Sequence, residues 1–197
     1  LLPLKSKNPI QIRKNAHSLA QLIRAQNVNI IHARSRAPAW SAWYAARKTG
    51  CHFVTTFHGT YNITNSLKKR YNSIMTRGER VIANSQFIAD HIVTNYSVDK
   101  ERIHIIYRGV DVAKYNPKSV TQARIIQVMS PWRLPDGKSV IMLPGRLTEW
   151  KGHGLLLEAL TYLKRDDYAV VFVGDSQGRE EYRRKLFEAR DKKRKEQ

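Results

Sequence analysis

Short apolar runs alternate along this chain with stretches of helical periodicity, and this alternation restricts the fold more than any other feature. We expect strands at residues 28–32, 51–57, 80–83 and 102–107. Helices are expected at about 9–26 and 38–50, with a third that Ser85 caps and whose apolar face is Phe87, Ile88, His91 and Ile92. Because most of the strands read as buried on both faces, the pattern predicts an α/β fold, with a parallel sheet covered by helices.

A second, shorter segment of the same kind follows an irregular stretch. Residues 111–138 hold Pro117, Pro131, Pro135 and Gly137, and they read as a connection between domains. Beyond it we expect a strand at 139–143, a helix at 152–163, a strand at 168–173 and a last helix from about 179 into 191–195. This is one βαβ unit with a trailing helix, which is shorter than a complete doubly wound domain.

Positive charge is the strongest signal in the composition. The chain has a formal net charge of +19, and its first acidic residue is Glu79. Such a charge favours an anionic partner: a nucleic acid, an acidic lipid or a phosphorylated small molecule. A solvated surface that keeps the protein soluble would carry the same charge. The single cysteine, Cys51, excludes an internal disulfide and fits a reducing compartment. No apolar run approaches the length of a membrane span. Since the chain begins at Leu1, we expect it to be processed, trimmed or excised from a longer protein.

Residues 145–152 (GRLTEWKG) lie between a predicted strand and the helix after it. In an open α/β sheet this turn faces the ligand crevice. Gly145 lets the backbone come close to a ligand, and the helix N-terminus favours phosphate. Arg146 and Lys151 add two cations, which would lower the barrier for departure of a diphosphate. They would also fit an ordinary basic surface.

His58 ends the predicted strand 51–57 and is followed by Gly59. A histidine at that edge can hydrogen-bond a sugar or a phosphate, or transfer a proton, although nearby backbone groups could equally satisfy it. Gly109 and Asp111 follow the strand at 102–107 and are candidates to shape a cleft; they could also form only a turn and a cap.

Three ordered groups of motifs resemble family 4 glycosyltransferases of the GT-B fold. They are 55–59 (TTFHG), then 81–85 (VIANS) with 108–111 (RGVD), then 143–147 (LPGRL) with Lys151-Gly152. Residues 32–40 (HARSRAPAW) are similar to a Gram-negative bacterial subgroup linked to lipopolysaccharide or capsule sugars. The ordered set is specific, although each motif alone is weak.

The resemblance implies two Rossmann-like domains facing each other across a cleft, both incomplete here. Residues 1–115 would be the C-terminal part of the acceptor-side domain, 116–138 the connection and 139–197 the first part of the nucleotide-sugar-binding domain. It implies transfer from a nucleotide-diphosphate-sugar to a glycan or lipid-linked acceptor, with retention. Arg146 and Lys151 would hold the donor diphosphate in place of a metal, so no metal or other cofactor is expected. His58 would lie near the transferred sugar as the catalytic residue.

Several family features are missing from this sequence. The first strand with its glycine-rich loop and the paired-glutamate segment are absent, so we expect the chain alone to have little or no activity. The implied location is cytoplasmic, peripheral on the inner face of the cell membrane, where basic helices with Trp40 and Trp43 would dock; core packing is the favoured role for both indoles. Two alternatives stay open: a basic nucleic-acid-binding domain, disfavoured because no specific nucleic-acid motif is present, and a non-catalytic nucleotide-binding fragment.

Overall fold

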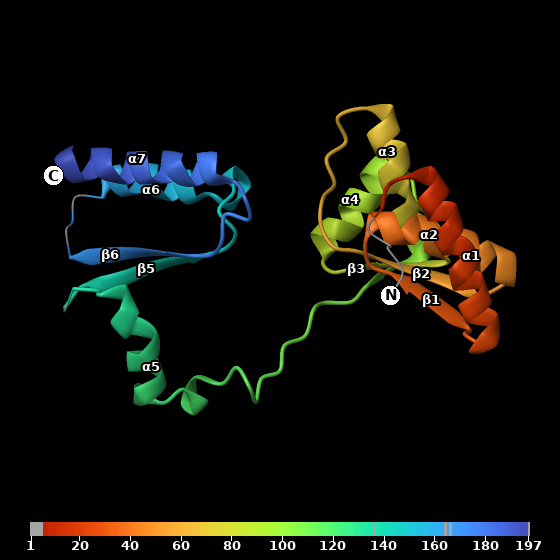
Figure 1. Ribbon diagram of the computed structural model, residues 1–197, viewed down its shortest axis with the longest axis horizontal. Coiled ribbons are helices and arrows are strands. Elements are labelled where there is room, and N and C mark those ends of the chain that lie inside the picture. The colour runs from red at the N-terminus through yellow and green to blue at the C-terminus, as the bar shows by residue number, and fades with distance from the viewer. Residues whose placement is uncertain (1–5, 136, 164, 166, 197) are drawn as a thin grey trace. The chain divides into compact units, whose positions relative to one another are not determined.

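The protein divides into two units, an N-terminal unit of residues 1–111 and a C-terminal unit of residues 112–197. The computed structural model describes residues 6–135, 137–163, 165 and 167–196, and from residue 192 onward only the backbone (Figure 1). Each unit has its own parallel sheet, four strands in the first and two in the second within the described ranges. This confirms the expected α/β class with parallel sheets.

The N-terminal unit alternates helices and strands. Its elements are α1 (Pro9–Ala25), β1 (Ile30–Ala33), α2 (Arg36–Thr49), β2 (His52–Phe57), α3 (Ser66–Asn72), β3 (Arg80–Ala83), α4 (Gln86–Tyr96) and β4 (Ile103–Ile105). The strands are parallel and lie in the order β1-β2-β3-β4. Because parallel connections are right-handed and the strand order never reverses, the helices all cover the same face of the sheet (Figure 1).

Local sequence explains where these helices begin and end. The Asn8 side chain accepts a hydrogen bond from the backbone N–H of Ile10, and Pro9 occupies the first turn of α1. Ser85 caps α4 by accepting from Ile88 N–H at 3.3 Å, as predicted. Gly50 ends α2 with φ of +75°, a left-handed conformation that glycine adopts at little cost.

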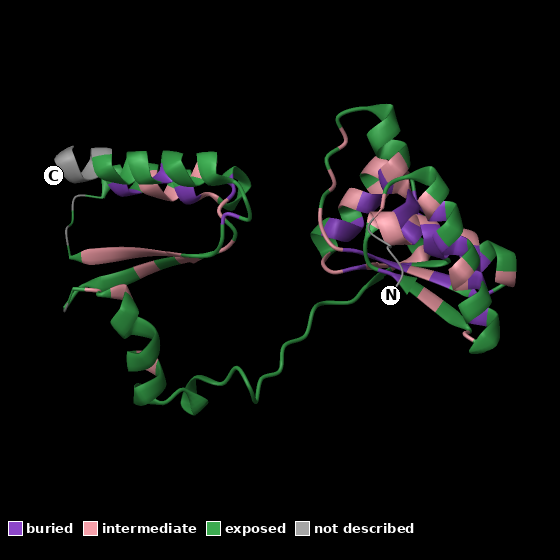
Figure 2. Cartoon of the chain, in the orientation of Figure 1, coloured by how far each residue is buried: buried purple, intermediate pink, exposed green. Residues whose placement is uncertain are grey.

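The core of the N-terminal unit lies between the sheet and its helices. Small residues let α1 and α2 approach closely, and larger side chains pack between the helices and the strands. Figure 2 shows buried positions on both the helices and the strands of this unit. The fully buried members of this core include Ala39, Phe57, Ile74, Met75, Val81 and Ile92.

Three expectations for this unit are wrong. The strands are not buried on both faces: Ile30 is 60% exposed and Val54 is half-buried, because only one face carries helices. Phe87 is 68% exposed, because Ile88 and Ile92, one turn apart, direct the apolar face of α4 toward the core instead. The expected strand at 102–107 is shorter, since β4 ends at Ile105.

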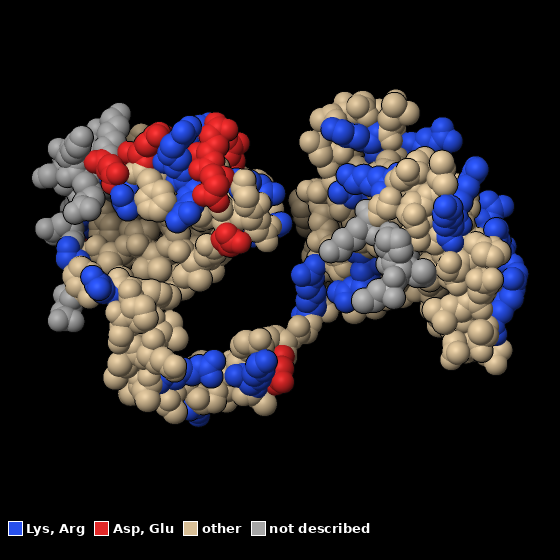
Figure 3. All heavy atoms as spheres, in the orientation of Figure 1, with Lys and Arg blue, Asp and Glu red and all other residues tan. Residues whose placement is uncertain are grey.

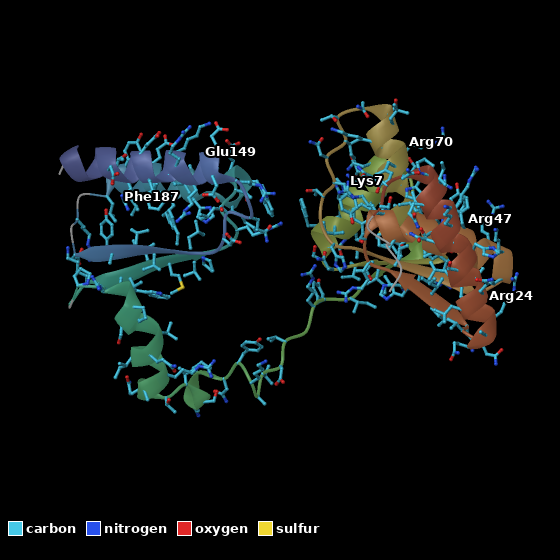
Figure 4. All side chains as sticks on the ribbon, viewed as in Figure 1. Lys7, Arg24, Arg47, Arg70, Glu149 and Phe187 are labelled. Carbon is cyan, nitrogen blue, oxygen red and sulfur yellow. The ribbon has the colours of Figure 1, made fainter. Side chains whose placement is uncertain are left out.

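The C-terminal unit contains α5 (Gln122–Met129), β5 (Ser139–Pro144), α6 (His153–Tyr162), β6 (Tyr168–Val173) and α7 (Glu180–Glu196). Strands β5 and β6 pair in parallel from Ser139 with Tyr168 to Pro144 with Val173. Helices α6 and α7 lie over the same face of this sheet (Figure 1). Phe187 lies on the side of α7 that faces the strands (Figure 4). The predicted βαβ unit with a trailing helix is therefore present.

Candidate functional site

Polar side chains follow the strands of the N-terminal unit at one edge of its sheet. Arg34 comes directly after β1, His58 after β2 and Asn84 after β3. Arg108 follows β4 by three residues, and the backbone N–H of Ile106 still donates to the carbonyl of Ala83 at 2.9 Å. Because the carboxyl ends of parallel strands share one edge, residues far apart in the sequence meet here.

His58 is the centre of this group. Arg34 Nε lies 3.4 Å from His58 Nε2, and Arg108 Nη2 lies 3.0 Å from His58 Nδ1. The Asn84 amide donates to the His58 carbonyl at 3.1 Å, which fixes the backbone beneath the ring. The pKa of His58 lies below its ordinary value of 6.5. Burial is the largest cause, followed by the nearby groups Arg108, Arg34 and His32. This lowered pKa favours the neutral imidazole, which has one hydrogen-bond donor and one acceptor.

His32 is a neighbour that the sequence did not single out. Its Nε2 lies 2.7 Å from the Thr56 hydroxyl on the adjacent strand. Burial and Arg34 lower the pKa of His32 as well. The sequence held one signal for this pair. His32 ends an apolar run, and a polar side chain in such a strand needs a hydrogen-bond partner, which Thr56 provides.

Three other residues of this unit were expected to shape a cleft: Gly59, Gly109 and Asp111. Gly59 is half-buried, Gly109 is exposed, and a Cβ added to either would meet no atom within 4 Å. Neither position thus needs glycine for steric reasons. Asp111 is exposed at the end of the N-terminal unit. The structure places all three near the strand ends but gives none of them a particular chemical task.

The expected diphosphate-binding loop of the C-terminal unit brings its cations around one indole. Lys151 Nζ lies 4.4 Å from the centre of the Trp150 ring, and the Arg146 guanidinium carbon lies 5.8 Å from it. The stem of Lys151 folds back over Gly145, where an added Cβ would lie 3.5 Å from Lys151 Cδ. Gly152, with φ of +80°, then turns the chain into α6. Gly145, Arg146 and Lys151 are thus neighbours in space as well as in sequence.

The loop after β6 completes this end of the sheet, although no motif in the sequence had pointed to it. Gln177 accepts a hydrogen bond from Arg146 at 3.3 Å. Leu147 N–H donates to the Asp175 carbonyl at 3.1 Å, and Gly145 N–H donates to Val173 at 2.8 Å. Beside the loop, a hollow of about 470 Å³ is lined by Thr148, Glu149, Trp150 and residues 178–182 and 185. The Gly174-Asp175 turn was the signal that could have indicated it.

The two units differ in surface charge. The face of the N-terminal unit in Figure 3 carries many Lys and Arg side chains, whereas α7 presents charges of both signs. Within the described ranges, no three His, Cys, Asp or Glu residues are grouped so that they could hold a metal ion. No helix in those ranges is long and apolar enough to cross a bilayer.

Comparison with known families decides the assignment. The family model described as Glycosyltransferase Family 4 matches residues 1–114, more than half of the chain. This chain belongs to glycosyltransferase family 4.

Individual relatives agree with this membership. A D-inositol 3-phosphate glycosyltransferase of Salinispora tropica is 26% identical over 180 residues, covering 81% of this chain and 37% of the relative. The crystal structure of a glycosyltransferase from Rickettsia africae is 42% identical, with a TM-score of 0.79, and covers 94% of this chain and 49% of that one. The chain therefore spans well under two thirds of the relatives that it matches.

A more distant structure supports the fold alone. Anabaena HepE in complex with UDP-glucose is 20% identical, with a TM-score of 0.75, over 88% of this chain and 47% of that one. The GT-B-like fold class is confirmed by these likenesses. The lipopolysaccharide or capsule subgroup is not confirmed, because the Salinispora tropica relative is, by name, a D-inositol 3-phosphate glycosyltransferase.

Proposed function

We propose that this chain is part of an enzyme that transfers a sugar from a nucleotide-diphosphate-sugar to a glycan or lipid-linked acceptor, with retention of anomeric configuration. The bond between the anomeric carbon and the diphosphate oxygen breaks as the acceptor oxygen bonds that carbon, and the acceptor hydroxyl passes its proton to the departing diphosphate. The observation that carries the proposal is the loop at 145–152, where Arg146 and Lys151 flank Trp150 beside a helix N-terminus.

The chemistry of the loop fits a departing diphosphate. Negative charge grows on the diphosphate as the sugar bond breaks, and cations that are already in place stabilise that charge. Arg146 is held by Gln177, and the Lys151 stem packs on Gly145. Both cations are therefore already positioned before the donor binds, which lowers the entropy cost of binding. We propose that these two cations serve where a metal would otherwise be needed.

His58 has the complementary part in this proposal. A neutral imidazole can accept a hydrogen bond from a sugar hydroxyl and stay uncharged, or it can take the hydroxyl proton and become an imidazolium. The finer assignments also belong here: a role in cell-surface polysaccharide or lipopolysaccharide synthesis, and a cytoplasmic location at an anionic membrane surface. The basic face of the N-terminal unit favours such a surface over a neutral one.

Nucleotide binding tests the donor site directly. We would measure thermal unfolding of the chain with UDP, GDP and ADP and with their sugars, for the unmodified protein, Arg146→Ala and Lys151→Ala. The matched control is Arg124→Ala, which removes one positive charge from an exposed position on α5. One nucleotide should raise the melting temperature of the unmodified protein and of the control, and both loop variants should lose most of that rise.

The alternatives make different predictions in the same experiment. If no nucleotide stabilises the chain, or if Arg124→Ala loses as much as Arg146→Ala, the donor assignment is wrong. Binding without sugar transfer in the longer protein would indicate a non-catalytic nucleotide-binding protein. A nucleic-acid-binding domain would instead be stabilised by oligonucleotides, with a steep salt dependence.

A further inference from the structure

Two arginines approach the two ring nitrogens of His58, and the group has one hydrogen-bond acceptor fewer than its donors need. A guanidinium carries only donors, and a neutral imidazole has one acceptor nitrogen and one N–H. Arg108 lies 3.0 Å from Nδ1 and Arg34 lies 3.4 Å from Nε2. Whichever nitrogen carries the proton, one arginine therefore faces another donor. The longer distance, to Arg34, fits the unsatisfied side.

No carboxylate relieves this concentration of donors. In the described part of the chain, neither Arg34 nor Arg108 forms an ion pair with an acidic residue. The first acid along the chain, Glu79, pairs with His52 at the opposite end of β2, at 2.8 Å. Asp111 follows Arg108 and makes interactions of its own. The charged or titratable groups around His58 are thus two arginines and His32.

An anion would resolve the conflict. One oxygen can accept from a ring N–H and from the arginine beside it, while another accepts from the second guanidinium. Phosphate and carboxylate groups have this geometry, and arginine binds both through paired hydrogen bonds. Both arginine side chains are exposed, so a ligand can reach them from solvent.

We propose that Arg34, Arg108 and His58 bind an anionic group, a phosphate or a carboxylate, that is carried by the acceptor. The inference rests on the proposed function, because it is the transfer reaction that requires an acceptor. The group is assigned to the acceptor because the donor diphosphate has its own cations, Arg146 and Lys151, in the other unit.

Inorganic phosphate is the probe for this site. The ring signals of His58 in the full chain, labelled at histidine and identified by a His58→Gln variant, would be followed by NMR as phosphate replaces chloride at constant ionic strength. A saturable shift is expected, and the pKa of His58 should rise, because a bound anion favours the imidazolium. A histidine with only a structural role would show neither change.

Matched variants separate a site from general attraction. Arg34→Gln and Arg108→Gln should each weaken phosphate binding roughly tenfold, the effect of one lost charged hydrogen bond. Arg70→Gln removes the same charge from exposed α3 (Figure 4) and should leave binding unchanged. An unsaturable shift, or equal losses in all three variants, would overturn the site.

Arg146→Ala identifies the source of the anion. Phosphate binding at His58 should survive this change, whereas a response to UDP at His58 that disappears with it would assign the anion to the donor and overturn the acceptor proposal. Failure here is distinct from failure of the proposed function. The nucleotide experiment reads out Arg146 and Lys151, and the phosphate titration of the unmodified protein reads out His58.

Discussion

Replacing Gly174 with alanine should disrupt the C-terminal unit at the end where its candidate site lies. A Cβ at this position would lie 1.9 Å from the Gly145 carbonyl oxygen and 2.6 Å from its carbonyl carbon. Both atoms are backbone, so no side-chain rotation relieves the overlap. Since non-bonded carbon and oxygen need about 3.4 Å, the loops after β5 and β6 must separate by about 1.5 Å.

The free energy of unfolding should fall by about 3 kcal/mol. Overpacking of this kind costs roughly 1–3 kcal/mol. Separation of the loops also weakens the hydrogen bonds from Gly145 N–H to Val173 and from Leu147 N–H to Asp175, at about 0.5–1.5 kcal/mol each. The displaced Gly145 would carry Arg146 with it, so nucleotide binding should weaken in the same variant.

Hydrogen–deuterium exchange locates the effect. Amides of β5 and β6 should lose protection roughly 100-fold in Gly174→Ala, the equivalent of about 3 kcal/mol, while amides of β2 and β3 stay unchanged. Gly154→Ala is the matched control, because its Cβ would meet only the Tyr182 hydroxyl, at 4.0 Å, and alanine favours a helix by up to about 1 kcal/mol. Protection in Gly174→Ala within about threefold of the unmodified chain would refute the steric argument.

Two further predictions concern the N-terminal unit. Thr55 is fully buried and its hydroxyl donates to the Met75 carbonyl at 2.7 Å, so Thr55→Val should lower the free energy of unfolding by about 1–3 kcal/mol in urea titrations; Thr55→Ser, which keeps the donor, should cost less. Because the pKa of His58 lies below its unfolded value of 6.5, protons bind the unfolded chain first, and the stability of this unit should fall as the pH drops below 6.5 toward the folded pKa. Arg108→Gln removes one cause of the lowered pKa and should make that fall smaller when urea midpoints are compared across this range; an equal or steeper fall would contradict the assignment.

Local signals were enough to predict most elements. The helix expected from about Pro9 begins there, Ser85 caps α4, and the strand at 80–83 has the expected bounds. Such features act over a few residues, so the sequence displays them directly. Helix α3 was not predicted, because residues 66–72 are mostly polar and bury only Asn72. Its position depends on contacts with α2 and on the buried Ile74 and Met75 that follow it.

The candidate site was predictable only in part, for a similar reason. Arg146 and Lys151 are five residues apart, and one loop brings them together. His58 was identified from its place at a strand end, but its partners Arg34 and Arg108 are 24 and 50 residues away. They meet His58 only because β1, β2, β3 and β4 pair in register. Register follows from burial of a whole face, which no single motif encodes.

The indoles of the N-terminal unit bear on how its positive charge can act. Trp40 and Trp43 are partly buried against the core, and the Trp40 N–H donates to the Tyr71 carbonyl at 3.3 Å. Arg77 lies 4.6 Å from the Trp43 ring centre and Arg47 lies 5.0 Å from it, so both guanidinium groups stack on an aromatic surface. Arg77 also lies 5.3 Å from the Trp40 ring centre, so inserting the two indoles into lipid would remove core packing and three cation–π contacts. If the proposed membrane attraction exists, it should therefore come from the arginines and lysines at the surface of this unit, and it should weaken as salt screens them.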